Sequence, residues 1–201
     1  MREISPALNA TADQFFATLQ PPLMALVTDI RQQKARGSRM RPSVVLIDNS
    51  GLLSAKGRTT LVDKVAELVD ENLCGRGEMC EQYAVLLALA LDHLGIQARP
   101  VSGEAIYFDA QGKEIYRWRH VWVRVGDELI DGNVDSLVEN PAVPKTVQIA
   151  PYWGPIQATP RDRKLSGSGA RIGPDNDVIG IWWPDLKKWL DGPFAILAEN
   201  T

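Results

Sequence analysis

The sequence predicts an α+β fold in which one buried helix packs against an antiparallel sheet. The stretch Tyr83–Leu94 is apolar around nearly its whole circumference, which is typical of a central helix. It is followed by three extended segments, residues 98–108, 114–125 and 128–133. The turn sequences Asp109-Ala110-Gln111-Gly112 and Gly126-Asp127 connect these segments as in β-hairpins. A helix followed by an antiparallel meander belongs to the α+β class.

The bulk properties are those of an ordinary globular chain. Its 201 residues suffice for one domain with a core of about 58–135, and we see no linker or internal repeat that divides residues 1–201. A net charge of -3 gives no reason to expect nucleic acid as a partner, and no apolar run is long enough for a membrane span. The N-terminus lacks a basic-then-apolar signal, and two cysteines do not make a disulfide scaffold. We therefore expect a cytoplasmic protein that binds neither nucleic acid nor membrane. We expect no metal and no cofactor, and the oligomeric state stays open.

The N-terminal third predicts helices and one short strand. Residues 11–36 form two apolar stripes at helical spacing, interrupted by Pro21-Pro22. Residues 44–47 are a short apolar run, as in a strand. Thr60 followed by Asp63 resembles a capping box and predicts the start of a helix that ends near Leu73.

The C-terminal third carries weaker signals. Residues 141–180 contain proline and glycine repeatedly, which predicts an irregular, flap-like surface region. Residues 181–198 are rich in tryptophan, and we expect them to pack back on the core.

Cys80 is the first candidate for chemistry. It follows Gly75-Arg76-Gly77 and stands at the start of the predicted central helix. Unpaired backbone N–H groups and the helix dipole favour an anion there, so this position suits a thiolate nucleophile. The alternative is that Cys80 is a small apolar filler, as most buried cysteines are.

Of the two histidines, only His120 can act with Cys80. His93 lies thirteen residues after Cys80 on the same predicted helix, roughly 20 Å away. Alternation in the segment 114–125 places His120, Trp122 and Arg124 on one face and the valines between them on the core face. The polar face is either the wall of a cleft or a solvated sheet surface.

The hairpin supplies a third group. If Gly126-Asp127 is a two-residue turn, Asp131 and Asn133 fall on the His120 face within about 7–8 Å, the spacing of diagonal neighbours. A nucleophile, a base and a residue that orients the base form the working set for acyl transfer. Either Asp131 or Asn133 can orient His120.

The order of these motifs resembles the transglutaminase-like branch of the papain-like cysteine protease superfamily. The similar pieces, which span Gly75 to Asn133, are Cys80 at a helix start, Gly95-Ile96-Gln97-Ala98-Arg99 entering a strand, His120-Val121-Trp122 on a strand, and Asp131 after the next turn. The resemblance implies a papain-like core with Cys80 as nucleophile, His120 as base and Asp131 as orienting acid. Glu78 departs from the family, which usually has a small residue there.

A neighbouring family is also similar at one motif. Residues 76–81, RGEMCE, look like the start of the arylamine N-acetyltransferases, which use the same order of triad residues. Glu78, and Asp131-Gly132-Asn133 in place of the D-V-G of that family, depart from it.

We therefore expect a cysteine-dependent amide hydrolase or acyl transferase of the peptidase or deamidase type. Its substrate would be a protein, a peptide or a small amide, and it would act through a thioester on Cys80. The backbone N–H of Cys80 would be one oxyanion donor, with Asn72 and Arg76 as candidates for the second.

Two other classes of function are compatible with the sequence. One is a non-catalytic binding module that keeps the fold. The other is a zinc site built from Cys74, Cys80, His93 and His120, although the spacing of its two cysteines is unusual for zinc.

Overall fold

The computed structural model describes residues 41–47, 53–73, 76–144, 147–167, 169, 172–176 and 178–195, without the side chains of residues 71–73. The helices expected within residues 11–36 and the residue Cys74 lie outside the described part of the chain.

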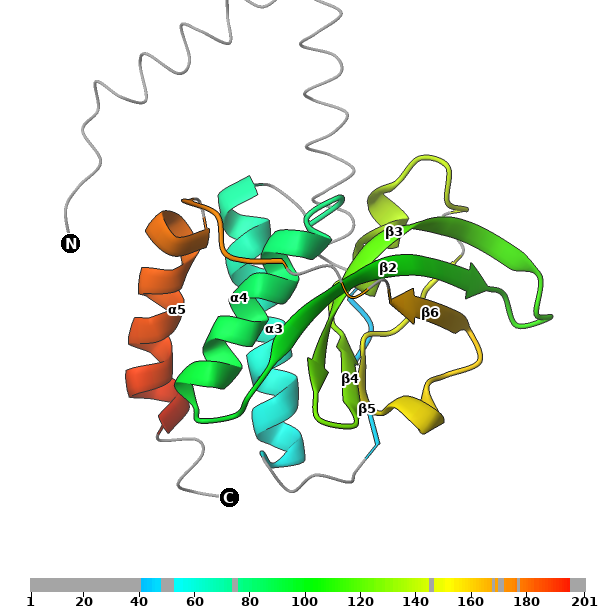
Figure 1. Ribbon diagram of the computed structural model, residues 1–201. Coiled ribbons are helices and arrows are strands. Elements are labelled where there is room, and N and C mark those ends of the chain that lie inside the picture. Colours follow the sequence, from blue (N-terminus) through cyan, green and yellow to red (C-terminus); the bar gives the residue numbers. More distant parts are fainter. Residues whose placement is uncertain are drawn as a thin grey trace, which may run out of the picture.

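The described strands form one sheet of six in the order β1-β5-β4-β3-β2-β6 (Figure 1). All neighbouring strands are antiparallel except β1 and β5, which are parallel. The strands are β1 (Val45–Leu46), β2 (Arg99–Phe108), β3 (Glu114–Val125), β4 (Glu128–Asp131), β5 (Tyr152–Pro155) and β6 (Arg163–Gly167).

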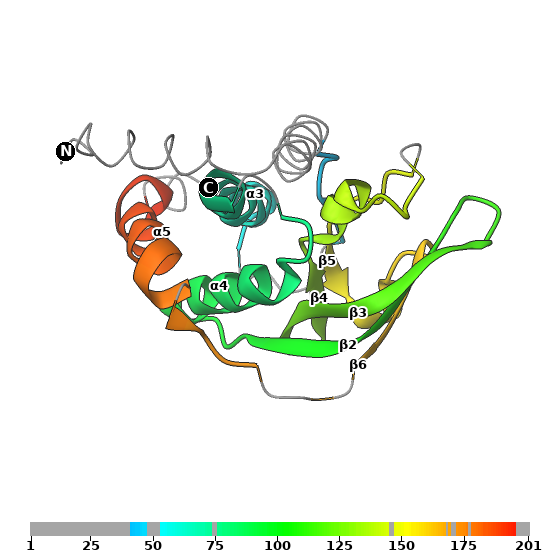
Figure 2. The same cartoon turned by 90° about the horizontal axis from the view of Figure 1, so that it is seen from above.

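The three α-helices within the described ranges pack on one side of this sheet, and the fold is α+β as the sequence predicts. They are α3 (Ala55–Leu73), α4 (Cys80–His93) and α5 (Trp183–Trp189). The central helix α4 lies between the sheet and the other two helices (Figure 2). Shorter helical turns complete the described chain: η1 (Val134–Glu139), η2 (Ile156–Ala158), η3 (Val178–Trp182) and η4 (Leu190–Phe194).

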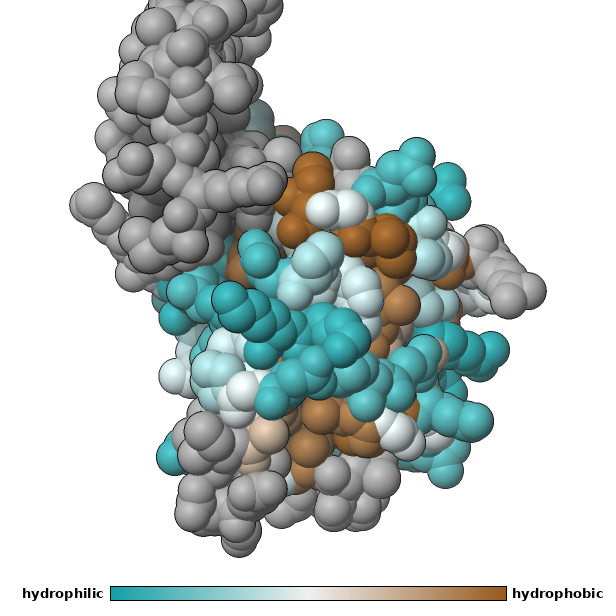
Figure 3. Space-filling model, turned by 90° about the vertical axis from the view of Figure 1, so that its left-hand side faces the viewer, coloured by the Kyte–Doolittle hydropathy of each residue, from teal (hydrophilic) through white to brown (hydrophobic). Residues whose placement is uncertain are grey.

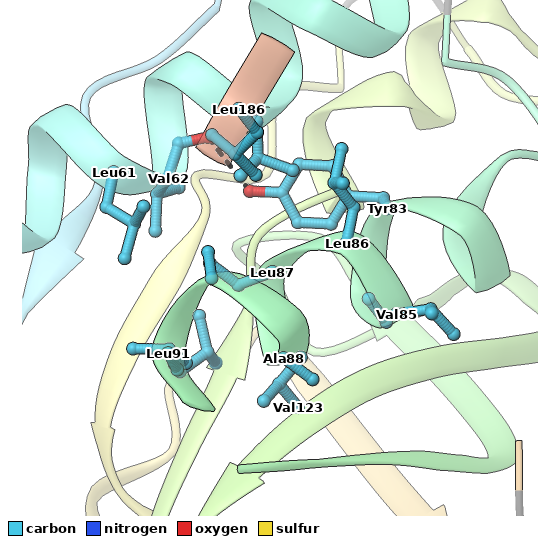
Figure 4. Close-up of a cluster of buried hydrophobic side chains, with 14 of the residues drawn as sticks. Leu61, Val62, Tyr83, Val85, Leu86, Leu87, Ala88, Leu91, Val123 and Leu186 are labelled. Atoms are coloured by element: carbon cyan, nitrogen blue, oxygen red, sulfur yellow. Dashed lines mark hydrogen bonds between the residues drawn. The ribbon is translucent and has the colours of Figure 1, made fainter. Parts of the chain in front are cut away.

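The main core forms around α4 because nearly every face of this helix is apolar (Figure 4). Leu86, Leu87 and Leu91 are fully buried, and Val121, Val123 and Val125 of β3 pack in the same cluster. The hydroxyl of Tyr83 donates a hydrogen bond of 3.0 Å to the carbonyl of Val62 in α3. α4 is thus fixed to both of its neighbouring layers.

The predicted hairpins and their register are confirmed. Val125 pairs with Glu128 across Gly126-Asp127, as a two-residue turn requires, and Val123 pairs with Ile130. Gly126 has a φ of 54°, in the left-handed region that this tight turn needs. The same register places His120 and Asp131 on one face of the sheet, opposite the core valines.

The predicted start of α3 is wrong by five residues. The helix begins at Ala55 rather than at Thr60, because Ser54 caps it. The Ser54 hydroxyl accepts a hydrogen bond of 3.1 Å from the backbone N–H of Gly57, which satisfies one free N–H of the first turn.

The region 141–180 contains two strands, which corrects the expectation that this region is irregular. β5 is an inner strand that pairs with both β1 and β4, and β6 extends the sheet beside β2. The sequence did not predict β5 because Gly154 and Pro155 are typical of loops. In the structure, Tyr152 and Trp153 of this strand are fully buried. By contrast, the described part of the tryptophan-rich C-terminus does pack back on the core, with Trp182, Leu186, Leu190 and Phe194 buried in the main cluster.

The molecular face nearest α5 is mixed in character. Hydrophilic side chains cross its middle, and hydrophobic areas lie above and below them (Figure 3). Ile179 and Ile181 of η3 are among the exposed large hydrophobic residues. Of the helices in the described ranges, none is both long and apolar enough to cross a membrane.

Candidate active site

The imidazole of His120 and the carboxylate of Asp131 form a buried hydrogen-bonded pair. Nε2 of His120 lies 2.8 Å from Oδ1 of Asp131, and both side chains are fully buried. Asn133 does not take this role, since its side chain bonds Arg76 and Ser136 instead. Of the two candidates in the sequence, Asp131 is therefore the residue that orients His120.

Arg163 holds the other oxygen of the same carboxylate. Its Nη1 donates to Oδ2 of Asp131 at 2.9 Å, while its remaining N–H groups reach Asp162 and the carbonyl of Ala150. Burial alone would raise the pKa of Asp131, but the charges of His120 and Arg163 outweigh it and lower that pKa. The carboxylate is thereby kept ionised although its side chain is fully buried.

The second ring nitrogen of His120, Nδ1, is not held by Asp131. Asp131 occupies Nε2. Nδ1 is also buried, and it has no hydrogen-bond partner of ordinary geometry among the described residues. Burial by itself would lower the pKa of His120, yet the Asp131 carboxylate, aided by the thiol of Cys80, raises it to about 9.

Aromatic rings fix the plane of the imidazole. Trp118, two residues earlier on the same face of β3, stacks on His120 with ring centroids 5.0 Å apart and an interplanar angle of 13°. Tyr107 of β2 meets the imidazole edge-on at 6.2 Å. A ring stacked in this way also favours the charged imidazolium. Burial and the charge of Asp131 together raise the pKa of Tyr107 well above its usual value.

A glycine brings the end of β4 against the start of α4. A side chain on Gly132 would overlap the ring and hydroxyl of Tyr83, which stands one turn after Cys80. Asp131, next to Gly132, can therefore approach the first turn of the helix that carries the thiol. Cys80 is 8% exposed, whereas His120 and Asp131 are fully buried, so Cys80 is the most exposed of the three candidate residues.

A buried charge network fixes the loop before Cys80. The guanidinium of Arg76 donates to Asp70, Asn133 and Asp135. The backbone N–H groups of Arg76 and Gly77 bond the carboxylate of Glu139. With its guanidinium committed to these partners, Arg76 does not serve as an oxyanion donor, contrary to one of the two candidates in the sequence. The side chain of the other candidate, Asn72, lies outside the described residues.

The backbone conformation of Glu78 is one that favours a small residue such as glycine. It has a φ of 64° and is the described non-glycine residue with a left-handed backbone. That conformation costs a residue with a Cβ roughly 1–2 kcal/mol. The chain thus keeps the turn that a glycine would make, although it carries a glutamate there.

His93 is remote from this site. It ends α4, and its Nε2 lies 2.6 Å from Oδ1 of Asp191. Within the part of the chain that the structure describes, no three histidine, cysteine, aspartate or glutamate side chains are grouped so that they could hold a metal ion. Cys74, one of the four proposed zinc ligands, lies outside that part.

Comparisons with known proteins do not assign a family. No protein-family model matches the chain, and no curated protein matches it significantly. A crystal structure from structural genomics, whose description gives no activity, is similar over 74% of this chain and 80% of its own chain. The two sequences are 16% identical, and the TM-score is 0.40.

The protonation state of His120 is directly testable, because the chain has only two histidines. We expect the NMR titration of the imidazole C–H signals to give a pKa near 9 for His120. In Asp131→Asn, loss of the carboxylate charge leaves burial dominant, and this pKa should fall below 6.5. The His93 signals serve as the internal control. A His120 pKa unchanged by the substitution would refute the pairing.

The same shift predicts how stability depends on pH. The folded-state pKa of His120 lies above the unfolded value of 6.5, so the imidazolium contributes stability below pH 6.5. That contribution is lost as the pH rises through 9, and Asp131→Asn should remove this part of the pH dependence of unfolding.

Relief of the strained turn gives a second test. We expect Glu78→Gly to raise the free energy of unfolding by about 1 kcal/mol, because glycine adopts a positive φ without a steric penalty. Glu81→Gly, in the first turn of α4, is the matched control and should lower it by about 1 kcal/mol. Chemical denaturation measures both. Destabilisation by both substitutions would contradict the assigned backbone conformation.

Proposed function

We propose that the protein is a cysteine-dependent amide hydrolase or acyl transferase that works through a thioester on Cys80. The main support for this proposal is the set of contacts that the two ring nitrogens of His120 make. Its Nε2 is held by Asp131, its Nδ1 has no hydrogen-bond partner among the described residues, and the Cys80 thiol helps to raise its pKa. This is the arrangement in which an imidazole can take a proton from a thiol and return it to a leaving group.

The steps follow from that arrangement. The raised pKa of His120 favours transfer of the thiol proton to Nδ1 before the attack, so the attacking group is the Cys80 thiolate beside an imidazolium. This thiolate attacks the carbonyl carbon of the amide. The tetrahedral intermediate collapses as the imidazolium gives its proton to the leaving amine, which leaves a thioester. Water or an amine, deprotonated by the same imidazole, then releases the acyl group. Asp131 stabilises the imidazolium and fixes its tautomer throughout.

The start of α4 supplies the electrostatic part of the proposal. Cys80 is the first residue of the helix, where backbone N–H groups have no partner within the helix. The N–H of Cys80 would therefore stabilise the developing oxyanion. The buried network of Arg76 and Glu139 holds the preceding loop in place, so this N–H and the sulfur keep a fixed relation to His120.

The assignment to a peptidase or deamidase type follows the resemblance to the transglutaminase-like branch of the papain-like superfamily. The order helix, strand with histidine, strand with aspartate is present in α4, β3 and β4. We also propose that the chain belongs to that superfamily and has its papain-like core. The substrate would be a protein, a peptide or a small amide.

Trapping the acyl intermediate tests the proposed nucleophile. We expect a reactive acyl ester probe at neutral pH to add one acyl group to the wild-type protein, as measured by intact mass. Cys80→Ala should abolish this adduct, because it removes the attacking sulfur. Cys74→Ala, which removes the other cysteine, is the matched control and should keep it.

Variants of the base distinguish catalysis from mere reactivity. His120→Gln should slow both acylation and deacylation at least about 100-fold, since proton transfer by a positioned base contributes that much. An adduct that survives Cys80→Ala would rule out the nucleophile. An adduct that forms equally fast without His120 would instead favour a binding module that keeps the fold.

A further inference from the structure

A cavity separate from the triad lies beside the second half of α4. Its volume is about 940 Å³, at the upper end of the range for sites that hold small molecules. Neither Cys80, His120 nor Asp131 lines it. Its apolar walls include Val85, Ala88 and Leu89 of α4, together with Val101, Trp122 and Leu129 of the sheet.

Two arginines enter this cavity side by side. Arg99 at the start of β2 and Arg124 near the end of β3 are direct partners in the antiparallel register, and both line the cavity. Side chains at such positions stand about 5 Å apart at Cβ, and like charges placed there destabilise a sheet. The fold therefore carries an unfavourable pair at this point.

No acidic side chain among the described residues compensates that pair. Neither guanidinium has a hydrogen bond or an ion pair with any of the described residues, and Nε of Arg124 is buried without a partner. The acidic side chain of the cavity wall, Asp92, accepts a hydrogen bond from the backbone N–H of Ala98. Arg163, which also reaches the wall, is committed to Asp131 and Asp162.

We propose that this cavity binds a small organic carboxylate, with the carboxylate between Arg99 and Arg124 and an apolar body against Trp122 and Leu129. Guanidinium groups match carboxylate oxygens through paired N–H donors, and such charge-assisted bonds are about twice as strong as neutral ones. A bound carboxylate also removes the repulsion between the two arginines. The site does not depend on the chemistry of Cys80.

A pair of probes that differ only in charge tests the proposal. Naphthalene-2-carboxylate and naphthalene-2-carboxamide have the same apolar body, and calorimetric titration of the full chain measures the affinity for each. We expect the carboxylate to bind at least about tenfold more tightly than the carboxamide, as loss of charged hydrogen bonds implies. Equal affinities, or no binding of the carboxylate, would overturn the proposal.

Substitutions locate the site. Arg99→Gln and Arg124→Gln should each weaken carboxylate binding at least about tenfold and leave carboxamide binding unchanged. Arg117→Gln is the matched control on the same strand, since Arg117 is paired with Glu104 and Glu114. Without ligand, Arg99→Gln should melt at the same temperature as wild type or higher, because repulsion is relieved. Wild-type carboxylate affinity in both cavity variants would show that the arginines do not form the site.

Discussion

The structure depends on one buried carboxylate shared by two cations. An isolated carboxylate away from water is costly, so Asp131 can stay ionised in the interior only because His120 and Arg163 each bind one of its oxygens. These three side chains come from β4, β3 and β6, and their pairing connects strands from the middle of the sheet to its edge. The orientation of the imidazole is thus a consequence of charge neutralisation in the core.

A second buried network sits only a few residues further along the chain. Asp135 and Glu139 of η1 hold Arg76 and the backbone of the loop that leads into Cys80. The short segment 131–139 therefore has two roles. Asp131, its first residue, positions the imidazole of His120, and Glu139, its last residue, holds the loop before Cys80. Gly132 allows the same segment to approach α4 closely. One segment thus contacts both the imidazole and the loop that precedes the proposed nucleophile.

Local periodicity was enough to predict the parts of the site that lie within one hairpin or one helix. The turn at Gly126-Asp127 fixed the register, and the register placed Asp131 beside His120. Partners brought from distant positions left no such pattern: Arg163 reaches Asp131 from 32 residues away, and Arg76 reaches Asp135 from 59. The inner strand β5 was missed because Gly154 and Pro155 resemble a loop. Arg99 and Arg124 are opposite each other because of the register between β2 and β3. This register shifts next to the hairpin, at Phe108, so counting from the turn does not give it.

In the proposed mechanism, the His120–Asp131 pair activates the sulfur of Cys80. The most direct measurement is the rate of alkylation of each cysteine by iodoacetamide at pH 6 to 7, followed by peptide mass spectrometry. We expect Cys80 to be labelled far faster than Cys74 in the wild-type protein and to lose this advantage in His120→Ala. Equal, slow labelling of the two cysteines in the wild-type protein would contradict it.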